Sequence, residues 1–151
     1  MTIATTSEMN EVMRRGWRDL GFYYNYDEST SQWQLVGSET GLAKFAELLM
    51  SYATDSRHEP ISEHKHYGPY FYLEFMTWEE RKMTDHAICG TLADFRDLSA
   101  IVRRKLSLSG AGSNFSIGDE YVPGTKTTIH FDVREEGFDP ASADPLLSHD
   151  S

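Results

Sequence analysis

The residues best suited to chemistry lie close together, between positions 58 and 66. Three histidines and two glutamates share this stretch, namely His58, Glu59, Glu63, His64 and His66. Zinc prefers imidazole and carboxylate ligands, and His64 and His66 can chelate one ion if the segment is extended. One interpretation is therefore a metal-dependent enzyme or sensor that uses His58, Glu63, His64 and His66.

The preferred interpretation of this stretch is a solvated or hydrogen-bonded loop without a metal. The helical zinc motif H-E-x-x-H is absent, and Arg57 and Lys65 place positive charge beside the histidines.

The glycine-rich stretch 109–113 follows an expected helix, whereas a phosphate-binding loop precedes one. Cys89 has no catalytic sequence context, so a buried structural thiol is favoured over a nucleophile. We therefore predict no catalytic residue and no cofactor.

The charge balance excludes some classes of protein. The chain has 151 residues, with 24 Asp and Glu against 14 Lys and Arg, and its net charge is −10. So acidic a chain repels phosphate backbones, which argues against nucleic-acid binding. No apolar run is long enough to span a membrane, and the N-terminal residues lack the apolar core of a signal peptide. With a single cysteine, this predicts a cytoplasmic protein.

Two stretches of the chain share one pattern at an offset of 53 residues. The offset places Gly37 on Gly90 and Ser38 on Thr91, and the apolar positions that follow coincide at helical spacing. Ser38 and Thr91 suit helix N-caps, and Asp94 completes a capping box with Thr91. The pattern predicts helices over about 39–52 and 91–106.

Alternating apolar residues predict strand pairs before each helix and a last hairpin after the second. The predicted fold class is α+β, a mostly antiparallel sheet of about six strands in a ββα-ββα-ββ repeat. Its two main helices pack on one face. Residues 1–134 form a single domain with repeats over 20–53 and 70–106. Residues 135–151 form an acidic tail, either docked or disordered.

Strand alternation sends a second set of side chains to the face opposite the helices. This face is rich in aromatic residues and methionine with carboxylates among them, which is typical of protein interfaces. The alternatives are that the tail or an N-terminal helix covers this face, that a second copy binds it, or that a small molecule does. We predict a non-enzymatic protein-binding module, with a structural homo-oligomer as an alternative. The predicted partner-binding residues are Tyr23, Tyr70, Tyr72, Glu74, Met76, Trp78, His130 and Asp132.

Short motifs within residues 20–106 also resemble a known group of proteins. They are Trp33-Gln-Leu-Val-Gly37-Ser38, then Gly41-Leu42 and Phe45, and His64-Lys-His66-Tyr-Gly-Pro-Tyr70. They resemble small bacterial proteins that include immunity proteins of polymorphic toxin systems. The resemblance implies a cytoplasmic protein that neutralises a toxin by direct binding, without catalysis of its own. Together with the acidic outward face, this makes a basic toxin domain the expected partner.

Overall fold

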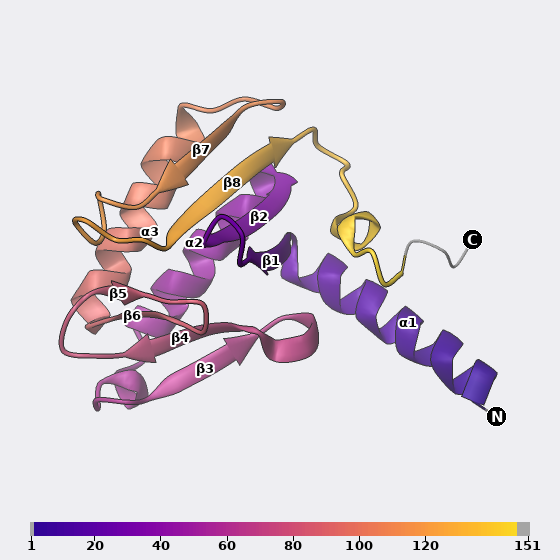
Figure 1. Cartoon of the computed structure of the whole chain (residues 1–151), viewed down its shortest axis with the longest axis horizontal. Coiled ribbons are helices and arrows are strands. Elements are labelled where there is room, and N and C mark those ends of the chain that lie inside the picture. The colour runs from indigo at the N-terminus through magenta and orange to yellow at the C-terminus, as the bar shows by residue number, and fades with distance from the viewer. Residues whose placement is uncertain (1, 148–151) are drawn as a thin grey trace.

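The computed structural model describes residues 2–147, which form three α-helices and eight strands (Figure 1). The helices are α1 (Thr2–Leu20), α2 (Glu39–Ala53) and α3 (Leu92–Ser107). The strands are β1 (Tyr23–Asp27), β2 (Gln32–Ser38), β3 (His64–Tyr67), β4 (Leu73–Thr77), β5 (Lys82–Met83), β6 (Ile88–Gly90), β7 (Asn114–Ile117) and β8 (Thr128–Arg134). The predicted α+β class is confirmed.

The strands form two mixed sheets, so the predicted single antiparallel sheet of about six strands is wrong. The first sheet has the order β1-β2-β8-β7, and the second has the order β3-β4-β6-β5. Each contains a parallel central pair, β2 with β8 and β4 with β6, flanked by antiparallel neighbours. Alternation shows which side of a strand is buried but not which distant strand lies beside it. The sequence therefore could not reveal the parallel pairs.

The order of elements also differs from the predicted ββα-ββα-ββ repeat. The chain runs β1-β2-α2-β3-β4 and then β5-β6-α3-β7-β8. Helix α2 leads from the first sheet to the second, and α3 leads from the second back to the first. Each sheet thus combines one strand pair from each half of the chain. Two strand pairs flank each helix.

Both predicted main helices are present, and their N-termini are capped as expected. The Ser38 hydroxyl accepts a 3.0 Å hydrogen bond from the backbone N–H of Gly41. Thr91 and Asp94 form the reciprocal capping box, with hydrogen bonds of 2.9 and 3.1 Å. These contacts satisfy backbone donors that a helix leaves free in its first turn.

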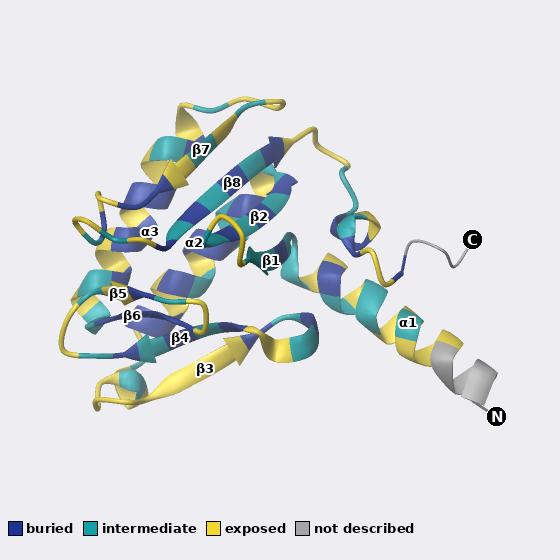
Figure 2. Cartoon of the chain, in the orientation of Figure 1, coloured by how far each residue is buried: buried dark blue, intermediate teal, exposed yellow. Residues whose placement is uncertain are grey.

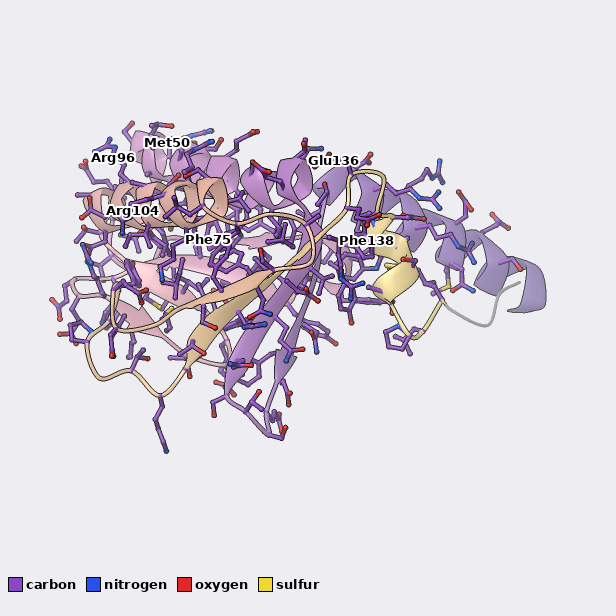
Figure 3. All side chains as sticks on the ribbon, turned by 90° about the horizontal axis from the view of Figure 1, so that it is seen from above. Met50, Phe75, Arg96, Arg104, Glu136 and Phe138 are labelled. Carbon is purple, nitrogen blue, oxygen red and sulfur yellow. The ribbon has the colours of Figure 1, made fainter. Side chains whose placement is uncertain are left out.

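The two helices form one layer and the strands another, with the apolar core between them (Figure 3). Phe75 lies between the layers, while Met50 and Arg96 lie on the helices (Figure 3). Alternation predicts that Phe71, Leu73 and Phe75 face the helices; Leu73 and Phe75 are buried, whereas 67% of Phe71 is exposed. Phe71 belongs to a short 3-10 turn, Pro69–Phe71, and not to a strand, so alternation does not apply to it.

The N-terminal helix and the C-terminal segment pack against each other beside the first sheet (Figure 1). Arg18 and Asp139 form an ion pair with Nη2 and Oδ2 2.9 Å apart. Beyond it, a 3-10 turn over Pro140–Ala143 packs on α1, so the described part of the acidic segment is docked. Within residues 2–147 no helix is both long enough and apolar enough to cross a bilayer.

Candidate functional site

A cavity of about 510 Å³ opens between β1, the segment 66–74, the β5–β6 loop and the C-terminal segment. We call it the aromatic cleft because eight of its lining side chains are Trp, Tyr or Phe. Four more are carboxylates, and the described lining residues include no Lys or Arg. The cleft is lined by Trp17, Tyr23, Tyr24, Asn25, Tyr26, Glu28, Trp33, His66, Tyr70, Phe71, Tyr72, Glu74, Asp85, His86, Asp144, Pro145 and Leu146.

Tyr24 fixes the rim of the cleft to the first sheet. Its hydroxyl shares its one proton between the carbonyl oxygens of Tyr67 and Pro69 and accepts from the backbone N–H of Tyr72 at 3.2 Å. Within the loop so anchored, Tyr70 and Phe71 have positive φ angles of 66° and 58°. This backbone region is unfavourable for residues with a side chain, and residues held in it cluster at functional sites. Three hydrogen bonds to one buried phenol hold the loop in this conformation.

The carboxylate of Asp144 closes the cleft on the side of the C-terminal segment. Asp144 is buried, and its Oδ2 accepts hydrogen bonds from Trp17 Nε1 at 2.9 Å and from the Tyr70 hydroxyl at 2.8 Å. Burial, together with the neighbouring Asp144 carboxylate, raises the pKa of the Tyr70 phenol far above its ordinary value. Tyr70 therefore stays protonated and can donate to Asp144 throughout the physiological range.

The predicted partner-binding residues fall into separate groups. Four of them line the cleft, namely Tyr23, Tyr70, Tyr72 and Glu74. Met76, Trp78, His130 and Asp132 lie outside its lining. His130 and Asp132 lie on β8, where His130 contacts Ser116 at 2.9 Å and Asp132 accepts from Arg134 at 3.2 Å. The eight residues therefore do not form one continuous face: the cleft combines Tyr23 of β1 with Glu74 of β4, whereas His130 and Asp132 lie on β8, outside the cleft lining.

Of the four predicted metal ligands, the structure brings only two together. His58 stacks on the ring of Tyr52 at 4.0 Å, with its Nδ1 3.0 Å from the Tyr52 carbonyl oxygen. His64 and His66 instead form a cluster with Glu74, in which one potential ligand atom from each residue lies within 4.8 Å of the others. In the described part of the chain, neither His58 nor Glu63 belongs to such a cluster.

Trp17, Asp144 and His86 are among the cleft residues that sequence reasoning missed. Trp17 and Asp144 lie near opposite ends of the chain, and each alone has the pattern of an ordinary helix or tail residue. The offset of 53 residues places His86 on the buried Trp33 and so predicts that it faces the helices, but 85% of its side chain is exposed. Residues 84–87 form a turn, in which the Thr84 N–H donates to the Ala87 carbonyl oxygen and the Thr84 hydroxyl accepts from the Ala87 N–H. The strand pattern therefore does not apply there.

Comparisons of the chain with protein-family models, with curated proteins and with solved structures found no match. The chemistry of the aromatic cleft and of the residues around it is the basis for a proposed function.

Proposed function

We propose that the protein is a non-enzymatic binding module whose aromatic cleft accepts a basic segment of a partner protein. The observation that carries the proposal is the composition of the cleft, with eight aromatic side chains and four carboxylates around one cavity. Aromatic faces attract cations through their quadrupole, and the carboxylates add a favourable electrostatic potential. A lysine or arginine side chain of a partner is the ligand that satisfies both.

The rim of the cleft is suited to contact a macromolecule. About two thirds of Phe71 and Tyr72 are exposed, at 67% and 69%. Tyr72 stacks beside Tyr70 with ring centroids 6.1 Å apart, so the exposed ring extends an ordered aromatic surface. Exposed aromatic side chains around a recess are typical of interface hot spots, and they lose little conformational entropy on binding.

Electrostatics favour a basic partner over an acidic or neutral one. The net charge of −10 accelerates encounter with a cationic protein and repels an anionic one. The resemblance to immunity proteins implies neutralisation of a toxin by direct binding, and the acidity of the chain favours a toxin domain that is basic. We therefore propose a basic protein domain of this kind as the partner.

Peptide binding tests the proposal. Tag-free protein is titrated with synthetic 15-residue peptides that are Arg/Lys-rich, neutral or acidic, and binding is followed by calorimetry and by tryptophan fluorescence. We expect only the basic peptides to bind, with an affinity that decreases as salt increases. Tyr72→Ala should lower the affinity at least about tenfold, the cost of losing a hot-spot aromatic residue.

Charge reversal at two sites gives a matched control. Asp85→Lys changes the charge in the cleft, while Glu47→Lys makes the same change on an exposed position of α2. Only Asp85→Lys should weaken binding of the basic peptides. Equal binding of acidic and basic peptides, or equal effects of the two reversals, contradicts the proposal. Light scattering measures the oligomeric state of the protein. A stable homodimer that does not bind the peptide would identify the cleft as a self-association surface instead.

A further inference from the structure

We propose that His64, His66 and Glu74 form a site for a divalent transition-metal ion of the zinc type at the rim of the aromatic cleft. The proposal stands on the geometry of these three side chains and does not depend on the proposed partner. Each offers one ligand atom, and the three atoms lie within 4.8 Å of one another. Two imidazoles and one carboxylate are a ligand set that suits zinc and leaves a fourth position open.

The strand register places the three ligands on one side of the second sheet. His64 and His66 are two residues apart on β3, so their side chains leave the same face. Glu74 on β4 is the direct antiparallel partner of His66, and its Oε2 lies 4.0 Å from His66 Nε2. Most of β3 is exposed (Figure 2), so an ion can reach the site from solvent without moving the core.

Backbone hydrogen bonds prepare both imidazoles for a metal. His64 Nδ1 lies 3.1 Å from the carbonyl oxygen of Ser62, and His66 Nδ1 lies 2.9 Å from that of Phe71. A carbonyl oxygen only accepts, so each Nδ1 carries a proton, and in the neutral ring Nε2 has the free lone pair. Metal-binding histidines use this arrangement, in which the second nitrogen donates to a carbonyl and fixes the tautomer.

Nearby cations do not oppose a metal at this site. Lys65 points to the other face of β3, where its Nζ lies 5.4 Å from the centre of the Tyr67 ring. Arg57 is paired with the carboxylate of Asp55, with Nη2 and Oδ2 2.7 Å apart. Both cations are close to the histidines in the sequence. Strand alternation, however, turns Lys65 to the other face of β3, and the ion pair with Asp55 neutralises Arg57.

The position of the site links it to the cleft. His66 and Glu74 line the cleft, and the Phe71 carbonyl that holds His66 belongs to the strained loop at its rim. An ion held by the three ligands lies at the edge of the cavity. Its fourth position is available to water or to a donor atom of whatever enters the cleft.

Titration of tag-free protein with Zn²⁺ alone, by calorimetry and by competition with a chromophoric chelator, tests the site. We expect one zinc ion per chain, with excess Mg²⁺ failing to displace it because magnesium prefers oxygen ligands. His64→Ala, His66→Ala and Glu74→Gln should each lower the affinity at least about tenfold, as losing even an outer-shell partner of a metal costs that much. Co²⁺ should give the visible absorption of a tetrahedral site.

His86→Ala is the matched control. His86 also lines the cleft beside a carboxylate, with Nε2 3.6 Å from Asp85 Oδ1, but no third ligand joins this pair in the described structure. This variant should bind zinc like the unaltered chain. Absence of stoichiometric zinc binding overturns the proposal, and so does an affinity that His64→Ala and His66→Ala leave unchanged. Circular dichroism of Glu74→Gln shows whether the fold is retained. Peptide titrations are run with a metal chelator present, so that peptide binding is measured without zinc and the two proposals are tested separately.

Discussion

The hydroxyl of Ser99 on α3 donates a 2.8 Å hydrogen bond to the carbonyl oxygen of Ala46 on α2. Both residues are buried at the contact between the helices. They are 53 residues apart, the same offset that places Gly37 on Gly90. The two helices therefore touch at equivalent positions, and small side chains there allow their backbones to approach closely.

Substitution of Ser99 tests how closely the helices are packed. Ser99→Ala should cost about 1 kcal/mol, the usual contribution of one hydrogen bond, because helix geometry already supplies Ala46 with a donor. Ser99→Leu should cost about 3 kcal/mol, since the added volume forces the helices apart. Urea unfolding measures both values. The neighbouring Ala100 is exposed, so Ala100→Leu should stay within about 0.5 kcal/mol, and an equal loss there would contradict this account.

Removal of the Asp144 carboxylate should loosen the cleft. Asp144→Ala leaves the buried indole N–H of Trp17 without its acceptor, which should cost about 1–3 kcal/mol in the free energy of unfolding. Limited proteolysis should then cut the C-terminal segment faster, because its link to α1 is weakened. Asp85→Ala is the control, since the Asp85 side chain is half exposed. Equal stability of the two variants would show that the Trp17–Asp144 bond is not stabilising.

Glu120 predicts a specific dependence of stability on pH. Hydrogen bonds from the Gly118 backbone N–H and from Lys105 lower the pKa of Glu120 from its ordinary 4.5 to about 2. The folded state has the lower pKa, so this stabilisation is complete above pH 4.5 and is lost as the pH falls toward 2. Because 35% of the side chain is exposed, solvent screening reduces the contribution to about 1 kcal/mol.

The difference in unfolding free energy between the unaltered chain and Glu120→Gln measures this contribution. It should be about 1 kcal/mol at pH 6 and approach zero near pH 2, while other carboxylates affect both proteins alike. A difference that stays constant over this range would show that ionisation of Glu120 is not its source.

Cys89 should be unreactive in the folded protein. It is 1% exposed, and burial raises the pKa of its thiol to about 11. The thiolate is the reactive form, so labelling by an aromatic disulfide reagent at pH 8 should be at least about 100-fold slower than in urea-unfolded protein. Rapid labelling of the native chain would contradict the buried position and would revive a catalytic role for this thiol.

The amino-acid sequence alone was sufficient for the features that depend on near neighbours along the chain. The caps at Ser38 and Thr91, the extents of the two main helices and most of the buried strand positions follow from contacts within a few residues. The interpretation of Cys89 as a buried thiol belongs to the same class. The sequence also indicated that His64 and His66 can chelate one ion if their segment is extended, but it favoured a loop there, and the structure places both residues on β3.

Only the tertiary structure decided which distant segments meet. The parallel pairs β2–β8 and β4–β6 join strands that the chain separates, and alternation carries no information about such neighbours. Trp17 and Asp144 meet across 127 residues to close the cleft, and Glu74 joins the two histidines through the register of β3 with β4. Backbone propensity and side-chain spacing act locally, whereas a site that combines several elements depends on how the whole core packs.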